Sequence, residues 1–383
     1  MSSAVDEVLK IQREWLKFVG VKGIGTSSFA RLLKFTSKLA FIEPGQFIFE
    51  FLQNAEDALM EAKRVGFFKI EFRKGADTKN IDYVIIEHNG KPFDIDDIKG
   101  FCSITTKKKP SKGYKGYIGL GAKSVFKVSD YIEVYSGKFT FKISKEYWDS
   151  AEGKKLLEQY SIGAIELPWQ LIPIPIKPAE FIPSEITRFV ITIDKQYRES
   201  ISKTLEDLRP HLFMFLEYIN KIEVIDNIKG KHRVIEWFTK DQDGLEDIKV
   251  QKVSITVIEN GSAHIRKFLV FKKVVQVPDD VKKDPTTIDA ERSDVDVREV
   301  ALAFELDPRN EEIKPFTEGM FWGVYSFLPL QEAKSGLNFL LQADFIVQVG
   351  RRQINYEAKW NYWLMESIAK VLRKIIPYLI KYY

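Results

Sequence analysis

The chain has 383 residues, of which 45% are apolar and 29% are charged, the profile of a globular protein with ample material for a core. Lys and Arg outnumber Asp and Glu by 58 to 54, and a net charge of +4 is too small to indicate nucleic-acid binding by itself. Cys102 is the only cysteine, which excludes an intrachain disulfide and favours a reducing, cytoplasmic location.

The sequence carries no pattern typical of secretion, membrane insertion or a metal cluster. It starts polar and then takes up a helical pattern, unlike a secretory signal. Its longest apolar runs, such as residues 319–330, fall short of the ~20 residues that a membrane span needs, so we expect no membrane partner. The histidines are scattered without metal-ligand spacing, at His88, His211, His232 and His264.

The first 200 residues combine helices with strands rich in β-branched and aromatic side chains. Three helices are predicted at residues 5–19, 27–40 and 45–66, and the last begins after Pro44 and ends at Gly66. A short fourth helix has Asp94 as its N-cap. Strands are predicted at residues 67–74, 81–88, 130–136, 138–144 and 187–194. This mixture predicts an α+β domain over residues 1–200.

Residues 201–383 are predicted to form a second α+β unit. A helix at residues 203–219 leads into it, and a helix at residues 356–380 closes the chain. Strands are predicted between these helices at residues 221–226, 232–240, 252–259, 266–277, 299–306 and 338–349.

The third predicted helix carries three polar residues on one face. Glu50 and Asn54 are four residues apart and Asp57 is three further, so the three side chains line up. They lie beside apolar Phe47 and Phe51, which makes the face a candidate site. Taken alone, such a triplet is more often a solvated helix face.

The stretch "GYKGYIGLGAKSVF" (residues 113–126) looks like a phosphate-binding loop, but neither common glycine motif fits it. A Walker A loop has glycine directly before its lysine, whereas Ala122 precedes Lys123 and Ser124 here. A dinucleotide-binding loop reads G-x-G-x-x-G, whereas this loop reads G-x-x-G-x-G. We expect "AKSVF" to begin a helix whose free N–H groups favour anions.

The order of the motifs resembles that of the GHKL ATPases, which include DNA gyrase B subunits, heat-shock chaperones of the ninety-kilodalton class, histidine kinases and MutL-type repair proteins. The motifs are E-x-x-x-N-x-x-D-A on a helix, a strand ending in "EHNGKPF", and G-x-x-G-x-G. Within that superfamily, "NGKPFDIDDIKGF", "GYIGLGAKSVFKVSD" and "ADFIVQVGRRQINYEAKWNYWL" resemble the sacsin and NO VEIN branch, related to those chaperones. The resemblance implies a Bergerat-type α/β sandwich that binds ATP, followed by a middle-domain-like α+β unit.

The resemblance assigns catalytic and metal-binding roles. Glu50 would act as general base toward the attacking water. Asn54 would bind Mg²⁺ through its amide oxygen, the kind of ligand that a hard cation favours. Asp57 would orient the helix or a water near the purine. Arg351 in "VGRRQIN", with Arg352 beside it and Asn355 as a polar helper, would reach the γ-phosphate on domain closure.

The purine end departs from the wider superfamily, in which an aspartate accepts from the adenine amino group. Counting back from Gly90 puts His88 at that position, whereas the sacsin-like pattern favours Asn89. We prefer Asn89, because an amide can both accept from the amine and donate to a ring nitrogen. Thr187 would sit beside the purine. Without the aspartate, selectivity for ATP over GTP is left open.

The phosphate end uses the glycine loop and a lid. The glycines would let the backbone approach phosphates, Lys123 would add a charge near them, and Thr106 and Lys107 would form the hinge of a basic lid. The residues implied for nucleotide binding are Asn54, Asp57, His88, Asn89, Gly90, Phe93, Thr106, Lys107, Gly116, Gly119, Gly121, Ala122, Lys123, Ser124 and Thr187.

The leading prediction is a slow Mg²⁺-dependent ATPase whose lid and domain closure acts on a protein client in a chaperone-like manner. A nucleic-acid-directed ATPase and a nucleotide-binding switch with little hydrolysis are alternatives. A histidine kinase is disfavoured, because no helix with a phosphoacceptor histidine precedes the domain. The aromatic-rich terminal helix predicts core packing or a homodimer contact.

Overall fold

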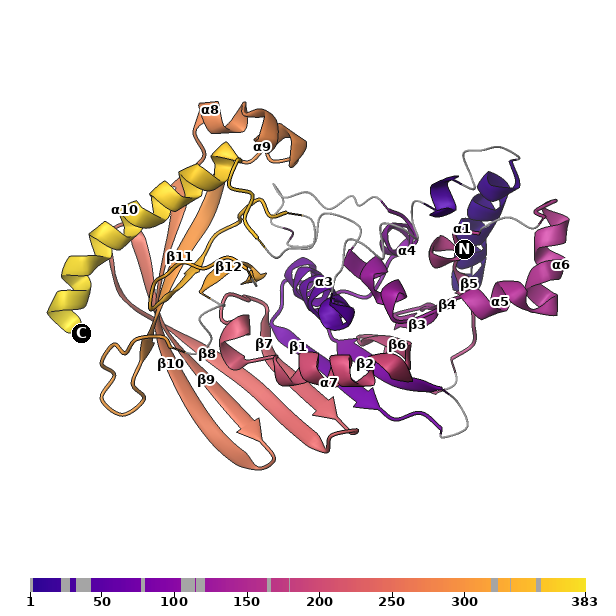
Figure 1. Cartoon of the computed structure of the whole chain (residues 1–383), viewed down its shortest axis with the longest axis horizontal. Coiled ribbons are helices and arrows are strands. Elements are labelled where there is room, and N and C mark those ends of the chain that lie inside the picture. The colour runs from indigo at the N-terminus through magenta and orange to yellow at the C-terminus, as the bar shows by residue number, and fades with distance from the viewer. Residues whose placement is uncertain are drawn as a thin grey trace. The chain divides into compact units, whose positions relative to one another are not determined.

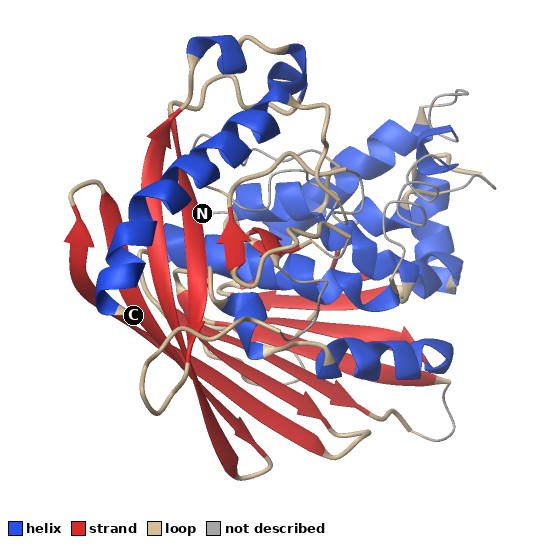
Figure 2. Ribbon diagram, turned by 60° about the vertical axis from the view of Figure 1, so that its left-hand side comes forward, coloured by secondary structure: helices blue, strands red, loops and turns tan. Residues whose placement is uncertain are grey.

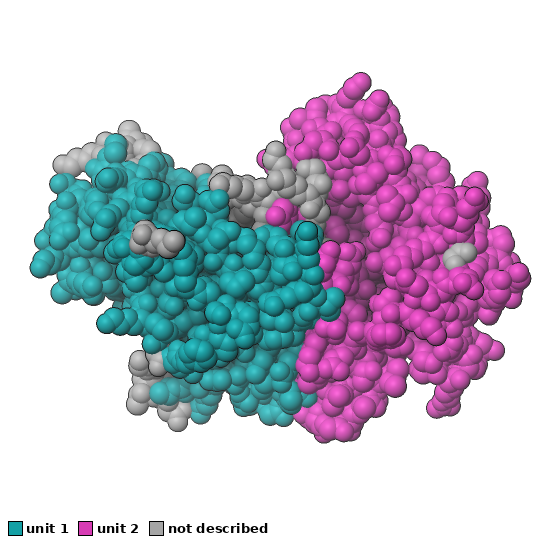
Figure 3. Space-filling model, turned by 180° about the vertical axis from the view of Figure 1, so that it is seen from behind, with its two compact units in different colours: residues 1–108, 116–207, 222–232 teal, residues 109–115, 208–221, 233–383 magenta. Residues whose placement is uncertain are grey.

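The computed structural model describes residues 3–21, 28–31, 43–76, 80–104, 114, 121–163, 167–178, 180–317, 323–330, 332–348 and 353–383. Helices and mainly antiparallel strands are mixed along the chain, which confirms the predicted α+β class. The chain divides into two compact units, residues 1–108, 116–207 and 222–232 in the first and residues 109–115, 208–221 and 233–383 in the second (Figure 3). No helix in the described part of the chain is long and apolar enough to cross a membrane.

The sheet of the first unit has the strand order β7-β1-β2-β6-β3-β4-β5. Strand β2 pairs antiparallel with both β1 and β6, and β3 pairs antiparallel with both β6 and β4. The strands are β1 (Gly66–Arg73), β2 (Ile81–His88), β3 (Tyr131–Ser136), β4 (Phe139–Ser144), β5 (Ile174–Pro175), β6 (Thr187–Asp194) and β7 (Ile219–Asp226).

Helices of the first unit pack on this sheet. The elements are α1 (Ala4–Gly20), η1 (Pro44–Gln46), α3 (Phe47–Ala62), α4 (Ile95–Phe101), η3 (Gly121–Lys127), α5 (Lys145–Asp149), α6 (Ala151–Gln159), η4 (Trp169–Leu171), η5 (Lys195–Tyr197) and α7 (Arg198–Glu206). Helix α3 lies beside β1 (Figure 1), and its Phe51 ring meets the ring of Phe189 in β6 at 4.8 Å. Helix α1 packs on β4 and β5.

Helix α3 begins where predicted but ends earlier than Gly66. Lys63 caps the helix in the left-handed conformation, with φ 52°, and its N–H donates to the Leu59 and Met60 carbonyls. Gly66 instead begins β1, where a Cβ would lie 2.1 Å from the side-chain oxygen of Asn89. The glycine therefore permits a close approach of two segments rather than a helix end.

The predicted helix at residues 203–219 is wrong. Helix α7 ends at Glu206, and Pro210 opens a separate 3-10 helix, η6 (Pro210–Phe213), before β7 begins at Ile219. Proline lacks the N–H of a helix interior and clashes with the preceding turn, so the helix cannot continue through it. Of the predicted helix at residues 27–40, residues 28–31 are helical and the rest lies outside the described residues. The predicted domain boundary after residue 200 falls inside α7, which packs on η1 of the first unit.

The second unit pairs an antiparallel sheet with the terminal helix. Its strand order is β13-β12-β14-β11-β10-β9-β8, and only β12 and β14 pair in parallel. Figure 2 shows α10 running obliquely across long strands. The elements are β8 (Lys231–Leu245), β9 (Ile248–Glu259), β10 (Ser262–Gln276), α8 (Asp279–Lys282), α9 (Pro285–Asp289), β11 (Val297–Leu306), β12 (Val324–Ser326), β13 (Leu328–Pro329), β14 (Leu340–Gln342) and α10 (Lys359–Tyr382).

The core of the second unit lies between α10 and the sheet. Trp360 and Leu364 of α10 are fully buried in one apolar cluster with Leu302 of β11. The strand predicted at residues 338–349 is limited to β14, because residues after Gln342 leave the sheet. Helix α10 therefore packs into the core, which is one of the two roles predicted for it.

Candidate functional site

Helix α3 presents the predicted polar face. Glu50 and Asp57 are buried, with Glu50 only 6% exposed, whereas Asn54 between them is partly exposed. The adjacent face of the helix packs Phe51 against Phe189 of the sheet, which fixes the rotation of the helix about its axis. The three polar residues therefore lie together on a helix held by its apolar side.

The end of the glycine loop lies directly against Glu50. A Cβ added at Gly121 would lie 2.0 Å from Glu50 Oε2 and 2.9 Å from its Cδ. Only glycine allows the backbone to come this close to the carboxylate. The other two glycines of the predicted motif, Gly116 and Gly119, lie outside the described residues. The structure thus brings Gly121 and Glu50, 71 positions apart in the chain, into contact.

The turn after β2 docks on the same helix, one turn beyond Asn54. A Cβ added at Gly90 would lie 2.7 Å from the Cβ of Ala58, and the N–H of Lys91 donates to the Ala58 carbonyl at 2.9 Å. The helix motif, the "HNG" turn and the end of the glycine loop therefore all meet on α3, as the resemblance implies.

Three polar residues form a row across adjacent strands at this end of the sheet. His88 is opposite Thr187 in the β2–β6 pairing, and Thr187 is opposite Ser136 in the β6–β3 pairing. All three are buried. The Thr187 and Ser136 hydroxyls are 2.6 Å apart, and the N–H of Phe93 donates to the Ser136 hydroxyl at 2.8 Å. The sequence alone did not single out Ser136 for this row, because its only signal is a hydroxyl at the end of a strand.

His88 and Asn89 differ in what their side chains do. The His88 Nδ1 accepts from the Gly90 N–H at 3.1 Å, and the imidazole lies 6.2 Å from the Phe189 ring. The Asn89 side-chain oxygen accepts from the Phe67 N–H at 2.9 Å. The atom expected to accept from the purine is therefore engaged in holding the turn against β1.

Lys123 points into the protein interior in this structure, which differs from the expected position near a phosphate. Its ammonium donates to the Phe101 carbonyl and lies 4.7 Å from the centre of the Phe101 ring. Burial lowers the pKa of Lys123 to about 8 and raises the pKa of neighbouring Cys102 to about 12. Contact with a phosphate would require Lys123 to leave this position.

The residues after Gly121 form the 3-10 helix η3 rather than the predicted α-helix. The Ser124 hydroxyl donates to the Gly121 carbonyl at 2.5 Å, which tightens the turn, and Ala122 between them is partly buried. The lid hinge residues Thr106 and Lys107 lie outside the described residues.

In the second unit, Arg351 and Arg352 also lie outside the described residues, but the segments on either side are described. Val347 bridges to Ile354, and the Gln348 N–H donates to the Gln353 carbonyl at 3.0 Å. The predicted helper Asn355 uses its side-chain oxygen to accept from the Glu357 N–H at 3.1 Å.

One buried amide holds this paired segment. The Asn361 side-chain oxygen accepts from the Ile346 N–H at 2.8 Å, and its NH₂ donates to the carbonyls of Ile346 and Asn355, each at 2.7 Å. Asn361 is fully buried in α10, so the helix fixes both sides of the segment. Sequence reasoning placed this residue in the aromatic helix without assigning it a role.

A buried ion cluster lies next to it. Arg292 and Arg298 both donate to the Asp344 carboxylate, at 2.5 Å and 2.7 Å, and the Trp360 indole donates to the Asp344 carbonyl at 2.8 Å. Burial by itself would raise the pKa of Asp344, but the two guanidinium groups outweigh burial and lower it. Asp344 therefore stays ionised and ties the segment after β14 to β11 and to the segment before β11.

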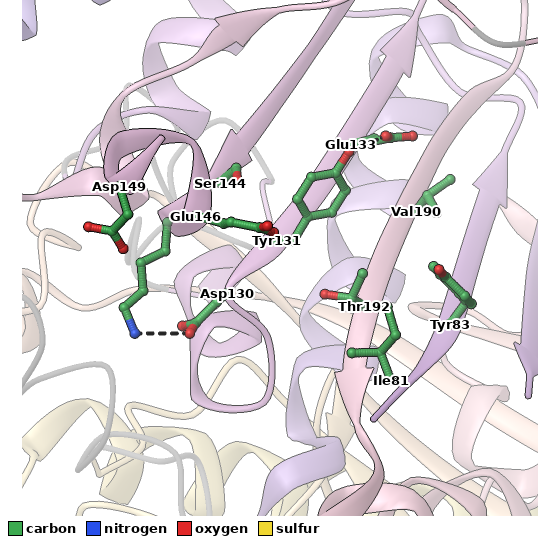
Figure 4. A pocket seen from close by; sticks show the side chains of 11 residues that line it. Ile81, Tyr83, Asp130, Tyr131, Glu133, Ser144, Glu146, Asp149, Val190 and Thr192 are labelled. Atoms are coloured by element: carbon green, nitrogen blue, oxygen red, sulfur yellow. Dashed lines mark hydrogen bonds and ion pairs between the residues drawn. The ribbon is translucent and has the colours of Figure 1, made fainter. Parts of the chain in front are cut away.

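A cavity of about 620 Å³ lies elsewhere in the first unit (Figure 4). Tyr83, Tyr131 and Val190 line it, on the face of the sheet opposite to buried Val84 and Ile132. At one side, Lys145 donates to Asp130 at 3.0 Å. Of the predicted site residues that the structure describes, none lines this cavity.

The predicted resemblance to the NO VEIN-like branch is confirmed by a relative. Protein NO VEIN of Arabidopsis thaliana is 24% identical over 353 residues, which cover 88% of this chain and 11% of that protein. The chain thus spans about a tenth of its relative's length. No protein-family model matches the chain.

Among solved structures, the B-subunit of the DNA gyrase from Myxococcus xanthus is similar over 55% of this chain and 60% of its own. The sequence identity is 9% and the TM-score is 0.31. This similarity is too distant to support any conclusion about the site.

Proposed function

We propose that the first unit binds a purine nucleoside triphosphate with Mg²⁺ and hydrolyses it slowly to the diphosphate and phosphate, ATP being the nucleotide that the resemblance implies. The observation that carries the proposal is the meeting of three distant segments on α3. Gly121 approaches Glu50, and Gly90 approaches Ala58, so two glycine turns flank the face that presents Asn54. The similarity to NO VEIN supports the same reading.

The residues fit the nucleotide and the ion chemically. At both turns a Cβ would clash with a residue of α3, so the backbone of each turn lies directly against this helix. Asn54 offers an amide oxygen on a partly exposed side chain, a ligand suited to Mg²⁺ when phosphates and water complete its shell. When bound, the ion would neutralise charge on the β- and γ-phosphates.

Glu50 is our proposed general base. Its carboxylate is buried and lies at the end of the glycine loop, where the terminal phosphate of a bound nucleotide would be placed. There it would accept a proton from water at Oε2 as the water attacks phosphorus. Positioned bases of this kind contribute about 10² to 10⁴ in rate.

Further parts of the proposal rest on the resemblance. Arg351 would complete the site by domain closure, and the closure would act on a protein client in the cytoplasm, in a chaperone-like manner. A nucleic-acid partner would instead show as hydrolysis stimulated by DNA and weakened by salt. A second copy of this chain is a further candidate partner, because α10 exposes Tyr362, Ile376 and Ile380 outside its core contacts.

The test compares Glu50→Gln with the parent chain. We expect nucleotide affinity to stay within a few-fold while phosphate release falls by about 100-fold or more. Glu14→Gln, an exposed glutamate on α1, is the matched control and keeps the parent rate. Unchanged turnover in Glu50→Gln would refute the base assignment. A parent chain that binds nucleotide without turnover would indicate a switch instead.

A further inference from the structure

We propose that the cavity of Figure 4 is a docking site for a basic peptide segment, whose arginine side chain enters between two tyrosine rings. The cavity lies on the face of the first unit's sheet that does not carry α3, so the inference holds whether or not the unit binds a nucleotide. It is carried by the shape of the cavity floor and by the charge of the residues around it.

The floor of the cavity is hollow because β6 carries short side chains between longer ones. Thr192 of β6 is opposite Tyr83 of β2, and Val190 of β6 is opposite Glu133 of β3. Tyr83 and Tyr131 lie on the two strands that flank β6, so their backbones are about 10 Å apart, twice the spacing of neighbouring strands. A planar group in contact with two rings spans about 7–8 Å. The cavity therefore has room for one such group between the tyrosines.

The ring of Tyr131 already contacts one cation. The ammonium of Lys142 in β4 lies 5.7 Å from the centre of the Tyr131 ring and 5.7 Å from that of Tyr147. Strands β4 and β6 flank β3 on opposite sides, so Lys142 approaches Tyr131 from the side away from the β6 floor. The face of an aromatic ring attracts cations through its quadrupole, and a second cation in the cavity would meet the same attraction.

Carboxylates around the cavity outnumber cations by four to one. Asp130, Glu133, Glu146 and Asp149 line it, against Lys145 alone. Lys145 is paired with Asp130 at 3.0 Å. Glu146 and Asp149 are exposed on α5, and neither has an ion-pair partner among the residues that the structure describes. Three negative charges are thus left for a ligand to balance.

Glu133 is held as a hydrogen-bond acceptor inside the cavity. Lys142 is opposite Glu133 in the β3–β4 pairing, yet its ammonium lies over the tyrosine rings instead. The hydroxyls of Tyr131 and Tyr135 donate to the two carboxylate oxygens of Glu133. Burial and the hydrogen bond to Glu133 raise the pKa of Tyr131, so the phenol keeps its proton. Each carboxylate oxygen can still accept one further N–H.

This combination suits a guanidinium better than other groups. A guanidinium is planar, stacks on aromatic faces and donates in a fork to carboxylates, whereas an ammonium is a compact point charge. The unbalanced carboxylates would repel a nucleic acid or an anionic membrane. The volume of about 620 Å³ exceeds that of one side chain, so neighbouring peptide residues would enter too. A second basic residue of the peptide would reach Glu146 and Asp149.

The experiment is calorimetric titration of the full chain with a capped peptide of sequence GRGRG, compared with the peptides GKGKG and GQGQG. We expect saturable binding of the arginine peptide, binding of the lysine peptide about fivefold weaker, and none of the glutamine peptide. Glu133→Gln should weaken binding about tenfold or more, and Glu146→Gln combined with Asp149→Asn about fivefold. Val190→Phe should abolish binding, because it fills the hollow without changing the charge. Glu158→Gln, an exposed glutamate of α6 outside the cavity, is the matched control and should keep the parent affinity.

Four results would overturn the proposal. The first is equal binding of the arginine and glutamine peptides. The second is parent-like affinity in Glu133→Gln and Val190→Phe, each shown to be folded by circular dichroism. The third is a loss in Glu158→Gln as large as that in Glu133→Gln, because the peptide would then be attracted by the overall surface charge. The fourth is binding of free arginine amide as tight as that of the peptide, because the site would then take a small cation rather than a peptide segment.

Discussion

Replacement of Gly121 by alanine is a sharp test of the contact between the glycine loop and the proposed base. A Cβ at this position would lie 2.0 Å from Glu50 Oε2, whereas ordinary contacts begin at 3.4 Å. The carboxylate oxygen must therefore move by about 1.4 Å. The atom that moves is the end of a flexible side chain, and the alanine meets the Glu50 Cβ at an ordinary 3.4 Å.

The structure therefore predicts a large loss of turnover with a small loss of stability. Misplacement of a reacting group by about 1 Å costs about 100-fold in rate. Rotation of one carboxylate costs about 1 kcal/mol of unfolding free energy, at the low end of the range for overpacking. Nucleotide affinity should change less than the rate, because the displaced group acts on water rather than on the bound nucleotide.

The assay is phosphate release under saturating nucleotide, together with urea unfolding of the same variant. Gly100→Ala in α4 is the matched control, because a Cβ there would meet nothing within 4 Å, and it should keep the parent rate. The loop contact does not position the base if Gly121→Ala keeps the parent turnover while Glu50 is still needed for that turnover.

Two predictions concern the second unit. Asp344→Asn should cost about 3–5 kcal/mol, because it leaves Arg292 and Arg298 without their buried counter-charge. The pKa of Asp344 is lower in the folded chain than its unfolded value of 3.8. Its contribution to the unfolding free energy is therefore complete above pH 3.8 and is lost as the pH falls below that value. The difference in unfolding free energy between the variant and the parent should shrink in this acidic range. Asn361→Ala should cost about 1–3 kcal/mol, because it leaves the buried Ile346 N–H unpaired, whereas the Ile346 carbonyl still accepts from the Asn355 N–H. Urea unfolding, at several pH values for Asp344→Asn, measures both.

Exposed residues of the same types serve as controls. Asp289→Asn and Asn310→Ala should each change the unfolding free energy by less than about 0.5 kcal/mol. Losses of similar size in the control and the buried variant would show that the buried hydrogen bonds do not carry the stability.

Local patterns were sufficient to predict much of the first unit. The alternation and β-branched content of residues 81–88 predicted β2 with its observed bounds, and Asp94 is the N-cap of α4 with both bonds of a capping box. The face of Glu50, Asn54 and Asp57 followed from helical spacing alone.

What was missed depends on contacts between segments distant in the chain. Ser136 joins the site only because β3 pairs with β6, which no local pattern reveals. The contacts of His88 and Asn89 depend on the Gly90 and Phe67 N–H groups, which donate to the two side chains. The motif around Lys123 predicts a phosphate ligand, yet the ammonium of Lys123 lies buried over the Phe101 ring.

The central claim is that the face of α3 between Gly90 and Gly121 holds a nucleotide with Mg²⁺. Calorimetric titration of the full chain with ATP, in Mg²⁺ and in EDTA, tests it most directly, repeated on Asn54→Ala. We expect saturable binding that Mg²⁺ strengthens in the parent chain, and binding without this Mg²⁺ dependence in the variant. Absence of binding for ATP, ADP, GTP and a non-hydrolysable analogue would contradict it.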